Sequence, residues 1–508
     1  MSLAIVLSRA QQGIAAPLIR VEVHLSNGLP GLTIVGLPEA AVRESKDRVR
    51  AALLSARFEY PSRRVTVNLA PDDLPKEGGR YDLAIALGIL AASGQIPATD
   101  LDDHEFVGEL ALNGELRPVR GIIPVTLQAR AAGRCLVVPK ANQAECGLIA
   151  DARTLHAHDL LEVCAHLHGQ TALPECAPEA GTLIDTPFGP NLSEVRGQAH
   201  ARRTLEIAAA GGHSLLFVGP PGSGKTMLAS RLPGILPPMS EDEALETAAI
   251  YSLTHHNRSV PGWRIRPFRS PHHTCSAVAL VGGGSHPRPG EISLANNGVL
   301  FLDELPEFDR HVLEVLREPM ESGTISISRA AQQVEYPARF QLIAAMNPCP
   351  CGHLGDPVSH CHCSPEKVHR YRQRISGPLL DRIDMHIEVP AVPIAVLTER
   401  VALEGEDSAT VRERVIGARE RQIRRQCKPN FELTAAELND TCRLDEEARR
   451  FLQDACTRLG MSARAYYRII RVARSIADLA ESHDILQAHL AEAVHYRQLD
   501  RRISGAQP

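Results

Sequence analysis

The chain has 508 residues, of which 44% are hydrophobic and 23% charged, and its formal net charge at pH 7 is −5. This length predicts about two to four domains with substantial cores, and the composition is that of an ordinary globular protein. The slightly acidic balance excludes a chain-wide positive field, so any nucleic-acid site has to be local.

The chain carries no recognisable signal for export or membrane insertion. Its N-terminus has no basic lead and too short an apolar run for a signal peptide, and the apolar segment 83–92 is shorter than a membrane span. We therefore expect a cytoplasmic protein without a membrane partner. In that compartment the 12 cysteines are expected to be reduced or to bind metal, not to form disulfides.

Residues 1–170 predict one α/β domain. Strand-like alternation occurs at Leu18–His24 and Arg64–Asn68, and Glu39–Ala56 has helical periodicity. The other expected elements are a strand at 33–36, a helix from about 82, a hairpin around 113–114, a helix at 125–132 and a strand at 135–138.

Two phrases of this domain, Pro75–Gly78 and Gly108–Val119, resemble the peptidase domain of Lon-type proteases. That family uses a serine nucleophile activated by a lysine. The serine position falls near Arg80 and the lysine position on Ile123, so both catalytic residues are missing; Lys76 is interpreted as a turn residue. The resemblance implies a Lon-like domain that is catalytically dead and serves as a scaffold, an oligomerisation module or a regulatory module.

Residues 171–190 are rich in Pro, Gly, Glu and Thr, which predicts a linker, and a helix is expected at 199–210. The strongest functional signal follows: Gly219-Pro220-Pro221-Gly222-Ser223-Gly224-Lys225-Thr226. It lies between an apolar run and a predicted helix, which is the context of a G-x-x-x-x-G-K-[ST] P-loop.

This P-loop predicts a nucleoside triphosphate site with ATP and Mg²⁺ as cofactors. Its glycines let backbone N–H groups point at phosphate oxygens. Lys225 is expected to reach the β- and γ-phosphates, and the Thr226 hydroxyl to bind Mg²⁺. A glycine-rich turn without a ligand is the weaker alternative.

Residues 251–290 are polar, basic and rich in His, Pro and Gly, with a helix expected just before them at 241–250. Arginine beside aromatic residues suits phosphate contact with some base stacking. A solvated loop packed on its neighbour is the alternative. The candidate side chains are Arg266 and Arg269, together with Arg264, His272, His273, Trp263 and Phe268.

The run Gly298–Leu302 ends in Asp303 and Glu304. An apolar run of this kind predicts a buried parallel strand with two carboxylates at its C-terminal end. Asp303 is expected to hold Mg²⁺, directly or through water. Glu304 is expected to polarise the water that attacks the γ-phosphate.

A helix is expected at 310–320, followed by a hairpin of strands 323–329 and 333–337 and by a core strand at 339–346. Beyond it lie two C-x-C pairs separated by nine residues, Cys349, Cys351, Cys361 and Cys363. Four soft ligands in two close pairs predict a structural, tetrahedral Zn²⁺ site in an insertion at 349–363. Reduced thiols without metal are the alternative.

The whole chain resembles AAA+ ATPases of the magnesium-chelatase-like group, most closely the ComM/YifB competence proteins. The resemblance implies a P-loop AAA+ core with a parallel sheet at 191–391 and an all-α lid, or magnesium-chelatase-type C-terminal domain, at 392–508. Lid helices are expected at 412–425, 445–459, 463–481 and 485–496. The matching phrases, besides the P-loop, are Arg266–Thr274, Phe301–Phe308, Asn347–Gly352 and Ile375–Asp384.

The same resemblance implies roles for three further residues. Asn347 corresponds to sensor 1, Arg382 to an arginine finger that completes the neighbouring subunit's site, and Arg464 to sensor 2 of the lid; ordinary ion pairs are the alternative for both arginines. A shared site implies a homo-oligomer, expected to be a hexameric ring. In similar helicases the hairpin lines a pore and grips nucleic acid, which makes Arg329, Gln332 and Gln333 DNA-contact candidates.

The leading functional hypothesis is a ring-forming ATPase that couples hydrolysis to DNA translocation. Its expected role is that of a helicase for branch migration and integration of incoming DNA in natural transformation. The alternative is a chelatase-like ATPase chaperone that remodels a protein partner; the chain lacks the acidic, Pro-rich linker and integrin-like domain of a stand-alone chelatase partner. The missing Ser–Lys pair disfavours a protease.

Overall fold

The computed structural model describes residues 3–177, 189–254, 263–284, 287–329, 332–355, 359–392 and 405–497, apart from the side chains of Ala40, Arg329 and Gln332. The centre of the expected linker (178–188), the hairpin tip (330–331) and the expected start of the lid (393–404) lie outside these residues. The chain forms two compact units. Unit 1 comprises Met1–Ile184, Leu245–Trp263 and Ala330–Tyr336, and unit 2 comprises Asp185–Ala244, Arg264–Arg329 and Pro337–Pro508.

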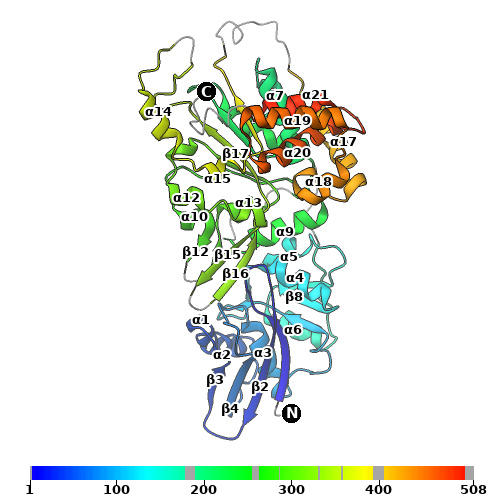
Figure 1. Cartoon of the computed structure of the whole chain (residues 1–508). Coiled ribbons are helices and arrows are strands. Elements are labelled where there is room, and N and C mark those ends of the chain that lie inside the picture. Colours follow the sequence, from blue (N-terminus) through cyan, green and yellow to red (C-terminus); the bar gives the residue numbers. More distant parts are fainter. Residues whose placement is uncertain are drawn as a thin grey trace. The chain divides into compact units, whose positions relative to one another are not determined.

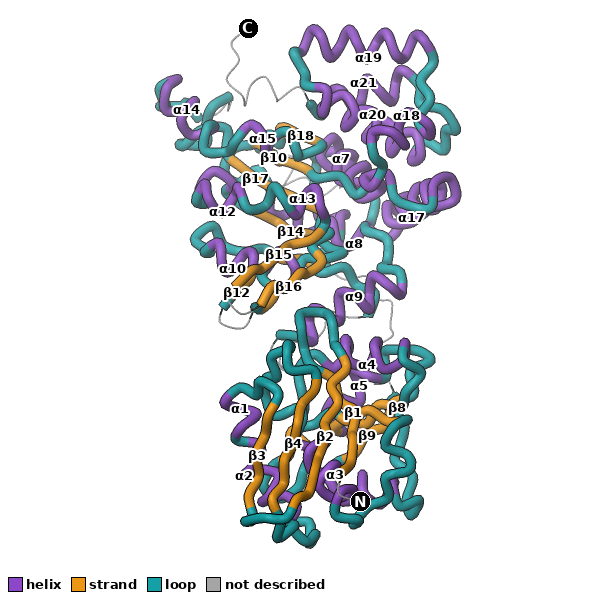
Figure 2. Tube along the Cα trace, turned by 60° about the horizontal axis from the view of Figure 1, so that its bottom comes forward, coloured by secondary structure: helices purple, strands orange, loops and turns teal. Residues whose placement is uncertain are grey.

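Unit 1 is built on a seven-stranded mixed sheet in the order β3-β4-β2-β1-β5-β8-β9. Figure 2 shows β3, β4, β2 and β1 side by side. Strand β2 is antiparallel to both β1 and β4, whereas β1, β5, β8 and β9 run parallel to one another. The strands are β1 (Leu3–Arg9), β2 (Leu18–Ser26), β3 (Gly31–Val35), β4 (Arg64–Ala70), β5 (His104–Phe106), β8 (Cys135–Pro139) and β9 (Thr154–Ala157), with a small hairpin of β6 (Glu109–Leu110) and β7 (Leu116–Arg117).

The helices of unit 1 cover this sheet. Helix α3 (Asp82–Ala92) is buried at every residue because it packs against β1 and β2. The segment 39–56, expected to be one helix, forms two, α1 (Ala40–Arg43) and α2 (Ser45–Ser55). The remaining helices are α4 (Ile122–Ala131), α5 (Gln143–Cys146) and α6 (Leu160–Leu167). The predicted strands at 18–24, 64–68 and 135–138 are confirmed, and β1, β5 and β9 were not predicted.

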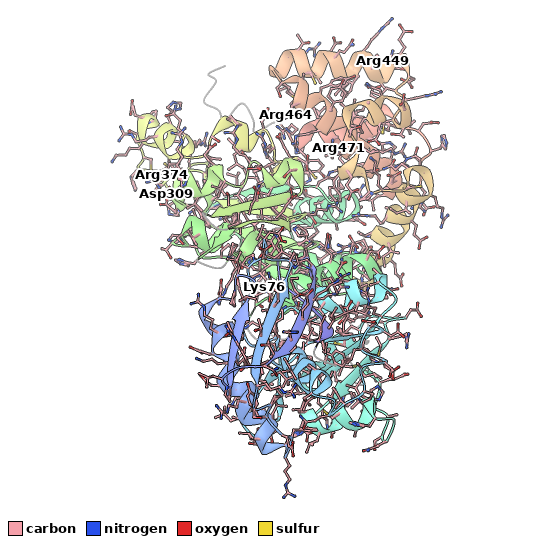
Figure 3. The ribbon with its side chains drawn as sticks, turned by 90° about the horizontal axis from the view of Figure 1, so that it is seen from below. Lys76, Asp309, Arg374, Arg449, Arg464 and Arg471 are labelled. Atoms are coloured by element: carbon pink, nitrogen blue, oxygen red, sulfur yellow. The ribbon has the colours of Figure 1, made fainter. Side chains whose placement is uncertain are left out.

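Arg80 and Ile123, the positions at which the resemblance to Lon-type proteases would place the catalytic pair, are both buried. Arg80 donates hydrogen bonds to Gln11 Oε1 and to the carbonyl of Arg120, and the Ile123 side chain lies in the core. Lys76 (Figure 3) is fully buried, and its Nζ donates to the carbonyl of Pro71. Burial lowers the pKa of Lys76. Its backbone forms a bridge to Pro38, so Lys76 is more than a surface turn residue.

Unit 2 is centred on a five-stranded sheet in the order β11-β14-β17-β10-β18, in which every pair is parallel. Every residue of β10, β14 and β17 is buried. Continuous apolar strands of this kind are typical of parallel sheets covered on both faces. The strands are β11 (Phe268–Arg269), β14 (Val299–Leu302), β17 (Gln341–Met346), β10 (Leu215–Val218) and β18 (Met385–Glu388), as the sequence predicts for β10, β14 and β17.

A short antiparallel pair, β12 (Gly282–Gly283) with β13 (Arg288–Pro289), accompanies this sheet. The predicted hairpin is confirmed as β15 (Thr324–Arg329) with β16 (Gln332–Pro337), and it is divided between the units. The single helix expected at 310–320 is instead α12 (Arg310–Glu314) and α13 (Pro319–Ser322). Pro319 causes the break, because proline has no N–H for an interior helical bond but fits the first turn of a new helix.

The helices of unit 2 pack around the sheet, and in Figure 1 α17, α19, α20 and α21 gather on one side of it. One hydrophobic cluster joins β10, β14 and β17 with α17 and α20, so the C-terminal helices share the core of the sheet. The helices are α7 (Ala199–Gly211), α8 (Lys225–Ile235), α9 (Glu241–Ser252, divided between the units), α10 (Ala277–Val281), α11 (Glu291–Leu294), α14 (Pro365–Arg372), α15 (Gly377–Leu380), α17 (Ser408–Gln426), α18 (Ala435–Thr441), α19 (Glu446–Leu459), α20 (Ala463–Leu479) and α21 (Gln487–His495). Among the described residues, no helix has both the length and the apolar character needed to cross a membrane.

Candidate nucleotide site and cysteine cluster

The P-loop of unit 2 connects the buried strand β10 to helix α8. Gly222 and Gly224 have φ angles of 75° and 85°, a left-handed conformation that glycine adopts without steric cost. A Cβ atom on Gly219 would lie 2.1 Å from the carbonyl oxygen of Val389. The path of this turn therefore requires glycine at these positions of the motif.

The ammonium group of Lys225 lies inside the loop. Its Nζ donates to the carbonyls of Gly219 (2.8 Å) and Pro220 (2.9 Å) and to Oδ1 of Asn347 (3.2 Å). Burial lowers the pKa of Lys225, and the carboxylates of Asp303 and Glu304 oppose that shift. The predicted sensor residue and the P-loop lysine thus meet directly.

Three parallel strands place the predicted catalytic groups at one edge of the sheet. Asp303 follows β14 and Asn347 follows β17, so both lie at carboxyl ends, as Lys225 does beyond β10. The Thr226 hydroxyl donates to Oδ2 of Asp303 at 2.6 Å. Glu304 takes a left-handed backbone conformation (φ 53°), and its N–H donates to Oδ1 of Asp303 at 2.9 Å.

These residues fit MgATP. The buried hydroxyl of Ser223 makes no hydrogen bond within the part of the chain that the structure describes, which leaves a polar group facing the loop without an acceptor. The Thr226 hydroxyl and the Asp303 carboxylate supply the hard oxygen ligands that Mg²⁺ prefers. A P-loop lysine and successive backbone N–H groups suit a triphosphate.

His273 is a residue of this site that the sequence did not assign to it. Its Nδ1 lies 3.1 Å from Oε2 of Glu304, and its ring packs edge-on against Phe308. From the sequence, His273 is expected only as part of a basic, His-rich loop. The available signal was the strand before it: β11 runs parallel to β14, so residues that follow either strand reach the same edge.

Two of the DNA-contact candidates, Arg266 and Arg269, form ion pairs and hydrogen bonds within unit 2. Arg266 pairs with Glu243 (2.9 Å) and donates to the carbonyl of Asn297 (2.6 Å). Arg269 makes two hydrogen bonds to Glu291, at 2.6 and 2.7 Å. Gln333 is exposed on β16, whereas the side chains of Arg329 and Gln332 lie outside the described residues.

Arg382 and Arg464 lie at the other end of the sheet from the P-loop. Arg382 precedes β18, which runs parallel to β10 with Met385 beside Leu215, so Arg382 is at the amino end of the strands. Its Nη2 lies 2.7 Å from Oε1 of Glu321, and Nη2 of Arg464 lies 3.4 Å from the same oxygen. Arg464 begins α20, which also carries Arg471 (Figure 3).

The four predicted cysteine ligands come together. All their Sγ atoms lie within 4.8 Å of one another, and three pairs are 3.4, 3.6 and 3.7 Å apart. Tetrahedral coordination with Zn–S bonds of about 2.3 Å requires S···S distances of about 3.8 Å. The backbone N–H groups of His353 and His362 also point at Cys351 and lower its pKa to about 6. The cluster can therefore hold a zinc ion.

The cysteine cluster also contacts the nucleotide site. Gly352 follows the first C-x-C pair. It lies so close to the P-loop that a Cβ on it would be 2.4 Å from Cδ of Pro221. On the other side, Arg372 of α14 donates to the carbonyl of Pro348 at 3.1 Å. The start of the insertion thus lies against the P-loop, and the residue just before it is hydrogen-bonded to α14.

Family models cover most of this chain. A model described as magnesium chelatase, subunit ChlI, matches residues 191–397, its C-terminal counterpart matches 405–497, and a ChlI-subunit model matches 21–142. The competence protein ComM of Haemophilus influenzae is 54% identical over 504 residues, which is 99% of this chain and 98% of ComM. The uncharacterised protein YifB of Escherichia coli is 53% identical over 501 residues, again 99% and 98% of the two chains. The chloroplastic magnesium-chelatase subunit ChlI-2 of Arabidopsis thaliana is 27% identical over 203 residues, 40% of this chain and 43% of that subunit. The chain therefore belongs to the magnesium-chelatase-like family of AAA+ proteins that includes ComM and YifB.

Proposed function

We propose that this chain is a ring-forming ATPase that uses ATP hydrolysis to move along DNA. Membership of the family implies ATPase activity with ATP and Mg²⁺, and it implies oligomeric assembly. ComM is named a competence protein, and competence is the uptake of DNA by cells. We infer that the substrate is incoming or branched DNA, and that the motor acts as a helicase in branch migration and integration.

One observation carries the proposal of a shared site. Lys225, Asp303 and Asn347 gather at the carboxyl end of the sheet, whereas Arg382 lies at the amino end. The four-residue strand β10 between these ends is about 13 Å long. An arginine on that side reaches a triphosphate only in a neighbouring chain, and such a finger couples hydrolysis to subunit contact.

The residues of each chain divide the chemistry among them. Lys225 and the loop amides bind the phosphates. Thr226 and Asp303 would hold Mg²⁺, which would neutralise charge on the phosphates. Glu304 accepts the proton of the attacking water, and Asn347 orients that water. Arg382 from the neighbour, with Arg464, stabilises the charge that develops on the γ-phosphate.

For the DNA we propose the hairpin β15–β16, with Arg329, Gln332 and Gln333 as contact residues. Arg266 and Arg269 form ion pairs within unit 2 and are not part of this proposal. The Lon-like unit is proposed to have no proteolytic activity, because Arg80 and Ile123 stand where a serine and a lysine would be needed.

Unwinding of forked and Holliday-type DNA tests the proposal. Wild type with Mg²⁺ and ATP is expected to unwind such substrates, and Lys225→Ala is expected to leave them intact because it removes the phosphate contact. Lys46→Ala, at an exposed position of unit 1, is the matched control and is expected to retain activity. A wild type that leaves every branched substrate intact overturns the proposal.

A chelatase-like chaperone is the second candidate, and the match to the ChlI family models favours it. That function predicts that a protein partner stimulates hydrolysis and that DNA does not. ATPase rates with single-stranded, duplex and branched DNA separate the two functions.

A further inference from the structure

We propose that Glu321 is a positioning residue that keeps Arg382 and Arg464 away from the neighbouring chain's site. It releases both arginines when DNA binds to the hairpin β15–β16. The inference deepens the proposed function, because it assumes that Arg382 and Arg464 serve the site of a neighbouring chain. It assigns to Glu321 the step that connects DNA binding by one chain to ATP hydrolysis in the neighbouring chain.

A single carboxylate oxygen binds both arginines. Oε1 of Glu321 lies 2.7 Å from Nη2 of Arg382 and 3.4 Å from Nη2 of Arg464. The side chain of Arg382 is only 8% exposed, so in this arrangement its guanidinium is withdrawn from any neighbour. Glu321 itself is 48% exposed, and so is Arg464. The carboxylate therefore holds one buried and one exposed cation together.

The guanidinium of Arg382 is incompletely satisfied in this position. Nη1 donates to the carbonyl of Pro378 at 2.8 Å and Nη2 contacts Glu321, but the buried Nε makes no hydrogen bond within the residues that the structure describes. A buried donor without an acceptor is unfavourable, and a phosphate oxygen is a strong acceptor for arginine. The withdrawn position can therefore exchange for one on a neighbour's triphosphate.

Glu321 is also attached directly to the hairpin. It lies in α13, which ends at Ser322, and β15 begins at Thr324. The Ser322 hydroxyl donates to the carbonyl of Thr324 (2.9 Å) and accepts from its N–H (3.2 Å). Gly323 closes the helix with φ 70°. This short junction leaves no free linker, so a force on β15 is expected to move α13 and its carboxylate.

The ion pairs of Glu321 with Arg382 and Arg464 are weak enough to open reversibly. A half-exposed pair is weak in water because solvent competes with it, so modest strain from the hairpin is enough to open it. Once it opens, Arg382 and Arg464 are free to face the neighbouring subunit together. The hairpin of one chain would then control hydrolysis in the next.

Steady-state ATPase rates of Glu321→Gln test this inference, with and without single-stranded DNA. The basal rate is expected to rise about two- to fivefold, the range that loss of an exposed ion pair allows, and stimulation by DNA is expected to fall toward none. Glu318→Gln, an exposed glutamate at the start of the same helix, is the matched control and is expected to behave as wild type. Ring formation, measured by mass photometry, is expected to be unchanged in both variants.

A double variant separates this role from a merely structural one. In an Arg382→Ala background, Glu321→Gln is expected to give no gain, because the residue that it releases is missing. A Glu321→Gln rate equal to that of Glu318→Gln, a loss of basal and stimulated rates alike, or a gain that persists without Arg382 overturns the inference. A wild type that hydrolyses ATP but ignores DNA overturns the proposed function alone, since the basal comparison still decides the role of Glu321.

Discussion

Glu304 is held in a conformation that its own sequence would not favour. Its left-handed φ of 53° costs a residue with a Cβ about 1–2 kcal/mol, and its N–H bond to Asp303 helps to hold that turn. The side chain is then fixed from the other side by His273 at 3.1 Å. Strain of this kind is typical of positions where a catalytic group must point away from the default direction of the chain.

Removal of the His273 ring is expected to lower kcat for ATP hydrolysis about tenfold and to leave KM nearly unchanged, because Glu304 loses its orientation while the phosphate contacts of Lys225 remain. The measurement is steady-state ATPase kinetics of His273→Ala. His311→Ala, at an exposed position of α12, is the control. Equal kinetics for the two variants contradict the orienting role.

The sequence predicts most of this site because each group directly follows a strong apolar strand. Asp303 and Asn347 have that position, and Lys225 lies at the end of the P-loop that follows β10, so a parallel sheet brings them together. His273 follows a strand of only two residues, too short to give a periodic pattern. The ion pairs of Arg266 and Arg269 were equally hidden, because their partners Glu243 and Glu291 are distant in the sequence.

At the scale of elements, the loop that carries the four cysteines supports the P-loop from outside. Gly352 contacts Pro221, and both Gly352 and Gly355 have left-handed φ angles, 84° and 81°. A Cβ at Gly355 meets nothing within 4 Å among the described residues. The two glycines thus share the same backbone restraint and differ in their contact with the nucleotide site.

Gly352→Ala is expected to weaken the binding of ATP roughly tenfold, since an overpacked contact costs about 1–3 kcal/mol and the P-loop has to shift to relieve it. Gly355→Ala carries the same conformational cost of about 1 kcal/mol but no clash, and its ATP affinity is expected to match wild type. Fluorescence titration with a labelled ATP analogue measures both. Equal losses in the two variants would show that the P-loop does not depend on this contact.

Removal of zinc from the cysteine cluster is expected to affect the P-loop. Purified protein is expected to contain about one zinc per chain, and Cys361→Ser to contain none, because a tetrahedral thiolate site needs all four ligands. Loss of zinc is expected to weaken ATP binding as Gly352→Ala does. Metal analysis by mass spectrometry measures the zinc content. Wild-type protein without zinc contradicts the prediction. Cys427→Ser, at an exposed thiol outside the cluster, is the control.

A buried histidine links helix α20 to the start of β10. His213 is fully buried with Nε2 2.7 Å from the hydroxyl of Ser475, and burial lowers its pKa to about 4, with Asp384 opposing the shift and nearby arginines adding to it. In the unfolded chain the pKa is about 6.5. As the pH falls from 6.5 toward 4, the unfolded chain therefore binds a proton that the folded chain does not, and stability is lost.

Between pH 6.5 and pH 5 the loss from His213 is expected to be about 2 kcal/mol in the free energy of unfolding. Urea unfolding followed by circular dichroism at both pH values measures it, and His213→Gln, which has no titrating ring, is expected to show a smaller difference by that amount. An identical pH dependence in the two proteins would mean that folding does not change the pKa of His213.

Prediction of the elements succeeded where the pattern is long and failed where it is short or interrupted. The periodic helices α17, α19 and α20 were predicted closely, and the hairpin β15–β16 was predicted from its two alternating runs. Strand β1 was missed although it lies in the middle of its sheet, because a short apolar run at the chain start has no local signal to distinguish a strand from a loop. The helix predicted at 310–320 is broken by Pro319.

At the scale of the whole molecule, the proposed site is divided between chains, and mixtures of inactive variants test that division. Lys225→Ala removes the phosphate contact and Arg382→Ala the finger, so each protein alone is expected to be inactive. In an equal mixture that assembles at random, about one quarter of the interfaces join an intact P-loop to an intact arginine, and about that share of the wild-type rate is expected. Mixtures that stay inactive despite assembling, shown by mass photometry, contradict a shared site.

The direction of the parallel sheet in unit 2 also restricts the symmetry of an assembly. Its carboxyl end carries the proposed triphosphate site and its amino end carries Arg382, the proposed finger, so the two ends have different proposed roles in an assembly. Two chains related by a two-fold axis would join like surfaces and leave the site incomplete. The proposed shared site therefore requires a head-to-tail contact, a type of interface that closes into a ring or continues as an open helix.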